Sequence, residues 1–285
     1  MKKIYIAGCG GMLGTAFYSQ FKNNYILKCT DKDVNESWLN FLDFRDFDEY
    51  KKDVLYFNPD YLFHLGAHTD LEYCEKNIED TYKTNTTSVE NAVYIANILN
   101  IPILYISSGG VFDGNKPAFD DWDIPNPNTV YGRSKYLGER FVVENAKRYL
   151  VCRAGWMMGG GIKDKKFVRK IKDQAGKKEI YVVNDKYGTP TYTVDFANTV
   201  RKLIESELWG VYNCVCEGQT SRLEVAREII RILGNETKII EISSGDMKDY
   251  FVERPLSECL LNSKLHLRGI TMRYWKDALN EYMNG

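Results

Sequence analysis

Tyr131 and Lys135, four residues apart, are the pair of side chains in this sequence best suited to proton transfer. On a helix they share one face, so the lysine ammonium can lie near the phenol. A neighbouring positive charge favours the phenolate and lowers the pKa of the tyrosine. The spacing therefore predicts that Tyr131 is a usable acid at neutral pH.

Upstream, the glycines Gly8, Gly11 and Gly14 follow a short apolar run, residues 4–7, and open a helical stretch. Without side chains, the backbone of such a turn can approach a pyrophosphate, and the helix N-terminus offers unpaired N–H groups. The context of strand, turn and helix predicts a dinucleotide site in which Met12 and Leu13 take part. The alternative is a glycine turn that serves packing alone.

Asp31 ends the next apolar run, residues 25–30, where a carboxylate can bind the ribose hydroxyls of an adenosine. The same charge would repel a 2′-phosphate, so the predicted cofactor is NADH or NADPH with NADH favoured. Lys32 beside it weakens that preference. The alternative is an ordinary solvated turn acid, because short turns favour aspartate.

Short apolar runs alternate with segments of helical periodicity along the first half of the chain. This alternation predicts an α/β fold, a Rossmann-like doubly wound parallel sheet. The runs are residues 4–7, 25–30, 61–67, 103–107 and 150–153, and the helical segments are 78–99 and 130–147.

After Arg153 the alternation ends in a glycine- and lysine-rich stretch. We therefore expect an NAD(P)-binding domain over residues 1–155, to which a segment at about 190–206 returns as a helix. Residues 156–189 and 207–285 then form a smaller C-terminal substrate-binding lobe.

The charge of the chain is balanced, with 38 basic and 39 acidic residues and a formal net charge of −1. Such a chain has no overall field to attract nucleic acid or an anionic membrane. The apolar run after Lys3 stops at Gly8, too short for a signal sequence, and no later run is long enough to span a bilayer. We expect a cytoplasmic protein with no nucleic-acid or membrane partner.

Seven cysteines, an odd number scattered along the chain, argue against a disulfide framework and for reduced thiols. Cys214 and Cys216 alternate in a strand-like segment and have no cysteine or histidine partner nearby in the sequence. Because zinc in proteins needs more ligands than these two, we expect no metal site.

Ser107 and Ser108 end the apolar run that begins at Ile103, and ligands of open parallel sheets bind beyond the carboxyl ends of strands. With Tyr131 and Lys135 they complete a Ser-Tyr-Lys set. Here the chain resembles the extended short-chain dehydrogenase/reductase family, and most closely the dTDP-4-dehydrorhamnose reductases. The segments that carry this resemblance are Ser107-Ser108, Val111 to Gly114, Tyr131 to Lys135, Asp185 to Thr191 and Arg254-Pro255.

The resemblance implies that a nicotinamide delivers hydride to the ketone carbon of a nucleotide-linked 4-keto-6-deoxysugar, and that Tyr131 protonates the oxygen. It implies that Lys135 lowers the pKa of Tyr131 and binds the nicotinamide ribose, while Ser108 stabilises the developing alkoxide. The alternatives are a buried tyrosine, an exposed lysine and a strand-end serine without catalytic roles.

The resemblance places further residues at the two ligands. A core role is favoured over catalysis for His64 and His68, and a surface role is the alternative for Arg254. The residues expected at the cofactor are Asp43 and Phe44 near the adenine, Ala67, Thr69 and Asn85; those expected at the sugar nucleotide are Trp156 and Arg254.

The chain departs from this family after Ser108, where the reductases usually carry an Asp-Tyr pair and this chain has Gly109-Gly110. We count both glycines as substrate-binding and expect room for a sugar bulkier than, or substituted differently from, 4-ketorhamnose. The alternative is a tighter loop, with the missing contacts made by Trp156 or Met158. Two further departures are Lys165-Lys166, where the family has a paired asparagine, and Lys186, where it has a glutamine.

The sequence thus favours a ketoreductase that makes a deoxysugar for a cell-surface polysaccharide. An epimerase or dehydratase of the same family is an alternative, and external NADH consumption would distinguish it. A non-catalytic nucleotide-binding regulatory subunit is a third, since the methionine adenosyltransferase β subunit is similar to these reductases. The expected partner is a nucleotide-sugar; the sequence does not fix the sugar, the nucleotide or the oligomeric state, and a homodimer is compatible with it.

Overall fold

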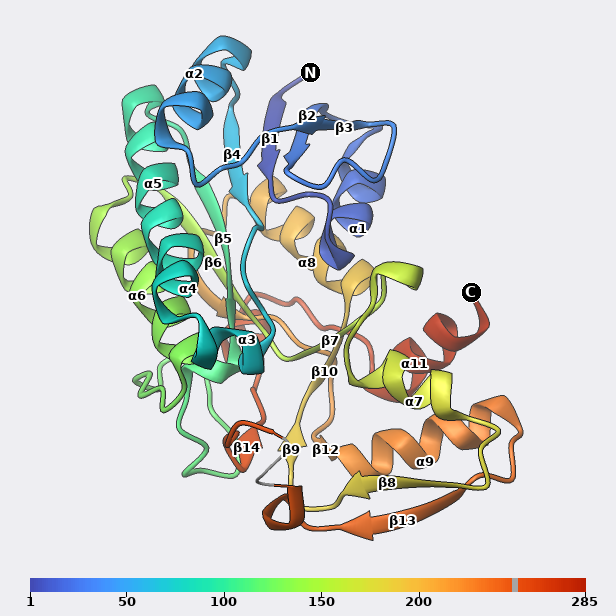
Figure 1. Ribbon diagram of the computed structural model, residues 1–285. Coiled ribbons are helices and arrows are strands. Elements are labelled where there is room, and N and C mark those ends of the chain that lie inside the picture. The colour runs from blue at the N-terminus through green and yellow to red at the C-terminus, as the bar shows by residue number, and fades with distance from the viewer. Residues whose placement is uncertain (248–250) are drawn as a thin grey trace.

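The apolar runs of the first half form the centre of a seven-stranded sheet in the computed structural model (Figure 1), which describes residues 1–247 and 251–285. The strand order is β11-β6-β5-β4-β1-β2-β3, and every pair is parallel. The strands are β1 (Lys3–Ala7), β2 (Ile26–Asp31), β3 (Leu39–Phe41), β4 (Tyr61–His64), β5 (Ile103–Ser108), β6 (Tyr149–Ala154) and β11 (Gly210–Asn213).

Helices cover both faces of this sheet (Figure 1). Ile4 and Ile6 of β1 pack in one core cluster with α1 (Met12–Phe21) and α8 (Thr193–Glu205). Tyr5 and Ala7, which alternate with them along β1, belong to a second cluster on the other face. This follows because successive side chains of a strand point to opposite faces. The helices of that face are α2 (Phe47–Phe57), α5 (Ser88–Leu99) and α6 (Val130–Asn145). The predicted doubly wound sheet is confirmed.

The segment 78–99, expected to be one helix, is interrupted. It consists of α4 (Ile78–Tyr82), a π-helical turn (Lys83–Thr87) and α5, and it follows the short α3 (Leu71–Lys76). The hydroxyl of Ser88 donates to the carbonyl oxygen of Thr84 at 2.6 Å. The wider turn brings Asn85 inward, where its side chain is fully buried.

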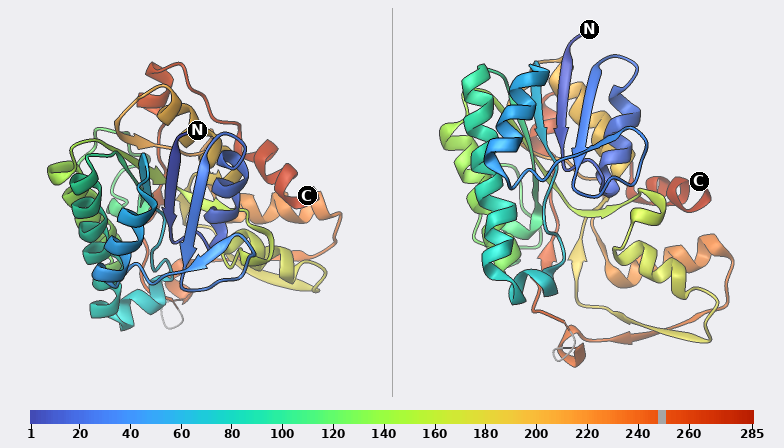
Figure 2. Two further views of the ribbon diagram at one scale, coloured as in Figure 1. Left: turned by 90° about the horizontal axis from the view of Figure 1, so that it is seen from above. Right: turned by 45° about the horizontal axis from the view of Figure 1, so that its top comes forward.

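A smaller lobe lies beyond the carboxyl ends of the strands (Figures 1 and 2). Three helices pack around its own apolar core, which contains Ile171, Ile229 and Leu279. These helices are α7 (Phe167–Gln174), α9 (Arg222–Leu233) and α11 (Trp275–Asn284), and a further short helix is α10 (Ser263–Leu267). The strands pair as β8 (Glu179–Val183) with β13 (Lys238–Ile242), β7 (Trp156–Met158) with β10 (Pro190–Tyr192), and β9 (Tyr187–Gly188) with both β12 (Thr220–Ser221) and β14 (Ser257–Glu258).

The chain returns to the sheet for longer than the expected segment at about 190–206. Helix α8 begins at Thr193, and β11 then pairs in parallel with β6, although its residues lie in the range 207–285 assigned to the lobe. Tyr212 of β11 is fully buried in the same core cluster as α1 and α8. The returning segment therefore extends to Asn213.

All seven cysteines are buried free thiols. In the described ranges no helix combines the length and the apolar composition that crossing a bilayer requires. Within the same residues, no three histidine, cysteine, aspartate or glutamate side chains are grouped as metal ligands would be.

A buried carboxylate fastens α6 to the middle of the sheet. Glu139 of α6 accepts a hydrogen bond from the Ser107 hydroxyl of β5 at 2.6 Å and from Arg153 Nη2 of β6 at 2.5 Å. Glu139 and Arg153 are 3% and 4% exposed, so water does not screen this ion pair.

We predict that Glu139→Ala lowers the free energy of unfolding by roughly 3–5 kcal/mol, because it leaves the Arg153 guanidinium buried without its partner. Glu144→Ala on the same helix is the matched control, since it removes an exposed pair with Arg140 at 3.4 Å. Exposed pairs contribute about 0–1 kcal/mol. Urea unfolding of both variants measures the difference, and equal losses would contradict the prediction.

Candidate active site

An open cleft lies between the carboxyl ends of the strands and the lobe. Its volume is about 1920 Å³, whereas a site for one small molecule commonly measures roughly 300–1,000 Å³, so the cleft has room for two ligands. Most residues that the sequence predicted as site residues line it: Gly8, Gly11, Met12, Leu13, Asp31, Asp43, Phe44, Ala67, Thr69, Ser108, Tyr131, Lys135, Trp156 and Arg254.

The three glycines of the turn have different tasks. Gly8 has a φ of +75°, and a Cβ there would lie 2.3 Å from the Cα of Gly66. A Cβ on Gly14 would lie 1.8 Å from the carbonyl oxygen of Cys9, and Gly14 does not line the cleft. Gly11 has no atom within 4 Å of its Cβ position and begins α1 without a side-chain cap. Two glycines therefore serve packing, and Gly11 leaves the helix N-terminus open to an anion.

Asp31 at the end of β2 ties the glycine turn to the neighbouring loop. Its Oδ2 accepts a hydrogen bond from the backbone N–H of Gly10 at 2.8 Å, and its Oδ1 accepts one from Asp33 at 3.0 Å. The same side chain lines the cleft. The carboxylate thus shapes the turn besides facing the position expected for the cofactor ribose.

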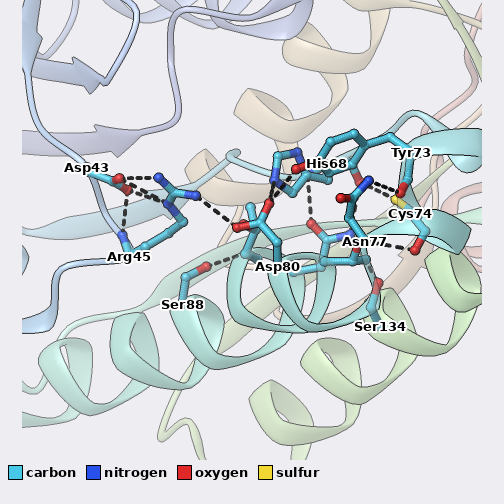
Figure 3. Close-up of polar contacts among 12 residues, drawn as sticks. Asp43, Arg45, His68, Tyr73, Cys74, Asn77, Asp80, Ser88 and Ser134 are labelled. Atoms are coloured by element: carbon cyan, nitrogen blue, oxygen red, sulfur yellow. Dashed lines mark hydrogen bonds and ion pairs between the residues drawn. The ribbon is translucent and has the colours of Figure 1, made fainter.

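A polar network supports the wall where the adenine is expected (Figure 3). Arg45 donates to both oxygens of Asp43, and this bonding holds the pKa of Asp43 below its usual range. Arg45 also reaches Asp80 of α4 at 3.3 Å, and Asp80 binds His68 Nε2 at 2.7 Å and the Tyr73 hydroxyl at 2.9 Å. The network joins the loops that follow β3 and β4 to α3 and α4.

The two histidines differ. His64 is fully buried, lies 3.1 Å from the Ser88 hydroxyl, and has its pKa lowered to about 3 by burial, so it is a neutral core residue as predicted. The same prediction is wrong for His68, which is half-buried and lines the cleft. Its position follows from the bond to Asp80, which holds the ring at the cleft wall rather than in the core.

Asn85 lies beneath the cleft and does not line it, contrary to its expected place at the cofactor. Its Oδ1 accepts from the backbone N–H of His68 at 2.7 Å. Its Nδ2 donates to the His68 carbonyl at 2.9 Å and to Ser134 Oγ of α6 at 3.0 Å. The amide is therefore occupied in holding the loop after β4 against α6.

Tyr131 and Lys135 stand one turn apart on α6, whose first turn is capped by Thr129 accepting from the N–H of Gly132 at 3.0 Å. Burial raises the pKa of Tyr131 to about 12, although the nearby Ser108 hydroxyl acts in the opposite direction. The expected lowering by Lys135 is not found. The Lys135 ammonium instead lies 4.2 Å from the centre of the Tyr105 ring, and burial lowers its pKa to about 7.

Gly109 and Gly110 are buried and do not line the cleft, so the expected enlargement of the sugar pocket does not arise at these two residues. A Cβ on Gly109 would lie 3.2 Å from the carbonyl oxygen of Glu258. A Cβ on Gly110 would lie 3.3 Å from Cε1 of Tyr131. Neighbouring groups fill the space, as in the tighter loop that was the alternative.

The lobe places Trp156 and Arg254 on the cleft, as expected, and adds Glu258 and Arg222. Trp156 Nε1 donates to Glu258 Oε2 at 2.8 Å, and the Arg222 guanidinium lies 3.6 Å from the Trp156 ring centre. Arg254 forms an ion pair with Glu72 of α3 at 2.5 Å, so it is neither isolated nor on an open surface. Sequence analysis missed Glu258 and Arg222 because neither stands in a recognisable motif.

The lysines before α7 also reach across the cleft. Lys166 Nζ donates to the Thr69 carbonyl at 2.7 Å and to its hydroxyl at 2.8 Å. Lys163 pairs with Glu36 at 3.0 Å. These contacts join the lobe to the loops of the sheet domain.

Comparison with known proteins places this chain in a family. Over residues 1–285 it matches the family described as RmlD substrate binding domain. It is 30% identical to the spore coat polysaccharide biosynthesis protein SpsK of Bacillus subtilis (strain 168), over 99% of this chain and 97% of that protein. It is 27% identical to a dTDP-4-dehydrorhamnose reductase of Aggregatibacter actinomycetemcomitans, covering 98% and 97% of the two chains.

A solved structure has the same architecture throughout. The dTDP-4-dehydrorhamnose reductase of Bacillus anthracis in complex with NADP superimposes with a TM-score of 0.92 at 27% identity, covering 99% of each chain. Sequence and fold agree along the full length, so this protein is a member of the RmlD substrate binding domain family.

Proposed function

We propose that this protein is an NAD(P)H-dependent reductase of a nucleotide-linked 4-ketosugar in polysaccharide biosynthesis. One observation carries the proposal: Ser108, Tyr131 and Lys135 line the same cleft as the open glycine turn. The similarity to dTDP-4-dehydrorhamnose reductases and to SpsK supports both the reaction and the pathway class. In this proposal the sheet domain holds the cofactor and the lobe holds the sugar nucleotide.

The residues of the glycine turn fit a dinucleotide. The start of α1 has no side-chain cap and no acidic residue in its first turn, so the N–H groups of Met12 and Leu13 are available for a pyrophosphate. Asp31 faces the cleft beside this turn. When bound, NAD(P)H supplies the hydride.

Tyr131 is the proposed proton donor. With a pKa near 12 the phenol is protonated at neutral pH, which is the state needed to protonate a ketone oxygen. The Ser108 hydroxyl, fixed by accepting a hydrogen bond from the N–H of Gly110 at 3.1 Å, can donate to the same oxygen as charge develops.

The lobe side of the cleft suits an anionic substrate. Several lysines and arginines there can attract the diphosphate of a sugar nucleotide, and an arginine can bind a phosphate with two parallel hydrogen bonds. The basic residues of the lobe that line the cleft include Lys165, Lys166, Lys170, Lys186, Arg222 and Arg254.

The reaction is tested with NADH or NADPH and a panel of dTDP-, UDP-, GDP- and CDP-linked 4-ketosugars, by following nicotinamide absorbance. A reductase consumes external cofactor with at least one of these substrates. An epimerase or dehydratase would convert the sugar without net consumption, and a regulatory subunit would bind nucleotides without turnover. Either result would overturn the proposal.

We predict that Tyr131→Phe lowers kcat by about a hundredfold or more, because it removes the general acid. Cofactor affinity stays nearly unchanged, since the phenyl ring still fills the site. Tyr136→Phe on the same helix, away from the cleft, is the control and keeps its rate. Steady-state turnover and cofactor titration measure both effects; near-wild-type turnover of Tyr131→Phe would show that another group is the acid.

We predict that cofactor binding at pH 8 takes up a proton through Lys135. With a pKa near 7 the amine is mostly neutral at this pH, and an anionic dinucleotide favours its charged form. Affinity is therefore full below pH 7 and falls above it. Titration calorimetry in buffers of different ionisation enthalpy measures the uptake, which Lys135→Met abolishes and the exposed control Lys147→Met retains. Equal uptake in both variants would exclude Lys135.

We predict that NADH binds at least about threefold more tightly than NADPH, because the Asp31 carboxylate repels a 2′-phosphate. Asp31→Asn reduces the preference, whereas Asp48→Asn, which removes an exposed charge outside the cleft, does not. Dissociation constants for both reduced cofactors decide this, and tighter binding of NADPH by the wild type would reject the role of Asp31.

A further inference from the structure

Glu258 reaches the cleft through a fixed arrangement of short strands. It lies on β14, which pairs with β9 so that Glu258 is opposite Gly188. A Cβ on Gly188 would lie 2.3 Å from the Trp156 ring, so the glycine admits this ring. Trp156 then donates its indole N–H to Glu258 Oε2 at 2.8 Å. The bond holds both side chains in one orientation on the cleft wall.

Gly109 allows this strand to approach the strand that carries Ser108. The position of a Cβ on Gly109 is only 3.2 Å from the Glu258 carbonyl oxygen, tighter than ordinary van der Waals contact. A larger side chain after Ser108 would push β14 away. The result is a carboxylate close enough to Tyr131 that its charge raises the pKa of the phenol.

The Glu258 carboxylate has unused hydrogen-bonding capacity. It is half-buried, and in residues 1–247 and 251–285 its only side-chain hydrogen bond is the one from Trp156, with no cation within ion-pair distance. The Arg222 guanidinium lies nearby but is stacked between rings, 3.6 Å from the centre of Trp156 and 4.5 Å from that of Phe167. An ionised carboxylate accepts about four hydrogen bonds, so Oε1 can accept from a ligand.

We propose that Glu258 selects the sugar by accepting a hydrogen bond from a hydroxyl or amino group of the ketosugar, while Trp156 holds the carboxylate in place. This inference rests on the proposed function and adds a specificity-determining residue to it. A neutral acceptor would suffice to bind Trp156, whereas a half-buried charge is costly unless a ligand also uses it.

The charge of Glu258 acts on two other groups that line the cleft, Tyr131 and Arg222. The charge of Glu258 raises the pKa of Tyr131, which would meet the ketone. The same charge opposes the lowering of the Arg222 pKa by burial. The charge of Arg254 acts in the other direction and lowers the pKa of Arg222. A ligand that contacts Glu258 would therefore also be close to Tyr131 and to Arg222.

The test compares a nucleotide with and without an attached hexose, using calorimetry with dTDP-glucose and dTDP. Glu258→Ala is expected to raise the Kd for dTDP-glucose by roughly ten- to hundredfold, the range for a hydrogen bond to a charged group. The Kd for dTDP should change less than about twofold, because dTDP lacks the hexose that Glu258 is proposed to contact. Glu236→Gln, which removes an exposed charge of the lobe outside the cleft, should alter neither value.

Glu258→Gln keeps the size and an acceptor for Trp156, and it provides the test if the alanine variant does not fold. Binding of UDP-glucose and UDP-glucosamine to this variant then distinguishes a hydroxyl donor from an amino donor on the sugar. If the donor is a hydroxyl, the glutamine variant weakens both ligands alike; if it is an amino group, UDP-glucosamine loses more affinity because the charge is lost. A thermal melt within a few degrees of wild type confirms that each variant is folded.

Equal weakening of dTDP and dTDP-glucose by these variants, or no change in either, would overturn the role of Glu258 and leave the proposed reductase intact. If the wild-type protein binds no sugar nucleotide and reduces no ketosugar, both proposals are overturned.

Discussion

The buried carboxylate of Glu139 is the interaction on which the geometry of the candidate site depends. It binds Ser107 of β5 and Arg153 of β6 at once, so α6 cannot slide along the sheet without breaking charge-assisted hydrogen bonds. Ser108 follows Ser107 directly, and Tyr131 is two helical turns from Glu139. The distance between the two candidate catalytic groups is thus set by buried bonds that involve neither of them.

Arg153 also connects the sheet to the lobe through a second buried polar group, Asp121. Its Nη1 donates to the Asp121 carbonyl at 3.4 Å, and the Asp121 carboxylate accepts from the backbone N–H groups of Asn213 at 2.6 Å and Lys264 at 2.8 Å. These contacts link β6, the edge strand β11 and α10 through buried polar groups. Because breaking such groups apart is costly, the base of the cleft is held more firmly than its rim.

At the rim the contacts are exposed or half-buried. Lys166 bonds to Thr69, and Arg254 pairs with Glu72, each joining the lobe to a loop of the sheet domain. Such contacts contribute little to stability and exchange readily with water or with a ligand. A cleft with a fixed base and an exchangeable rim can admit two nucleotides while keeping Ser108 and Tyr131 in register.

Local patterns were sufficient to predict the parallel sheet, the glycine turn at Gly8 and the shared face of Tyr131 and Lys135. These features depend on periodicity and on backbone geometry over a few residues, which the sequence records directly. The burial of a side chain in the folded protein cannot be predicted from such local patterns. The pattern predicted a lowered pKa for Tyr131, and desolvation in the folded protein raises it.

The tertiary structure alone decided which residues complete the cleft. The π-helical turn directs Asn85 below the site, β11 returns to the sheet, and β14 fills the space beside Gly109. Glu258 meets Trp156 across 102 positions of the chain. No local spacing encodes such a contact, because it exists only once β9 and β14 have paired and the lobe has packed against the sheet.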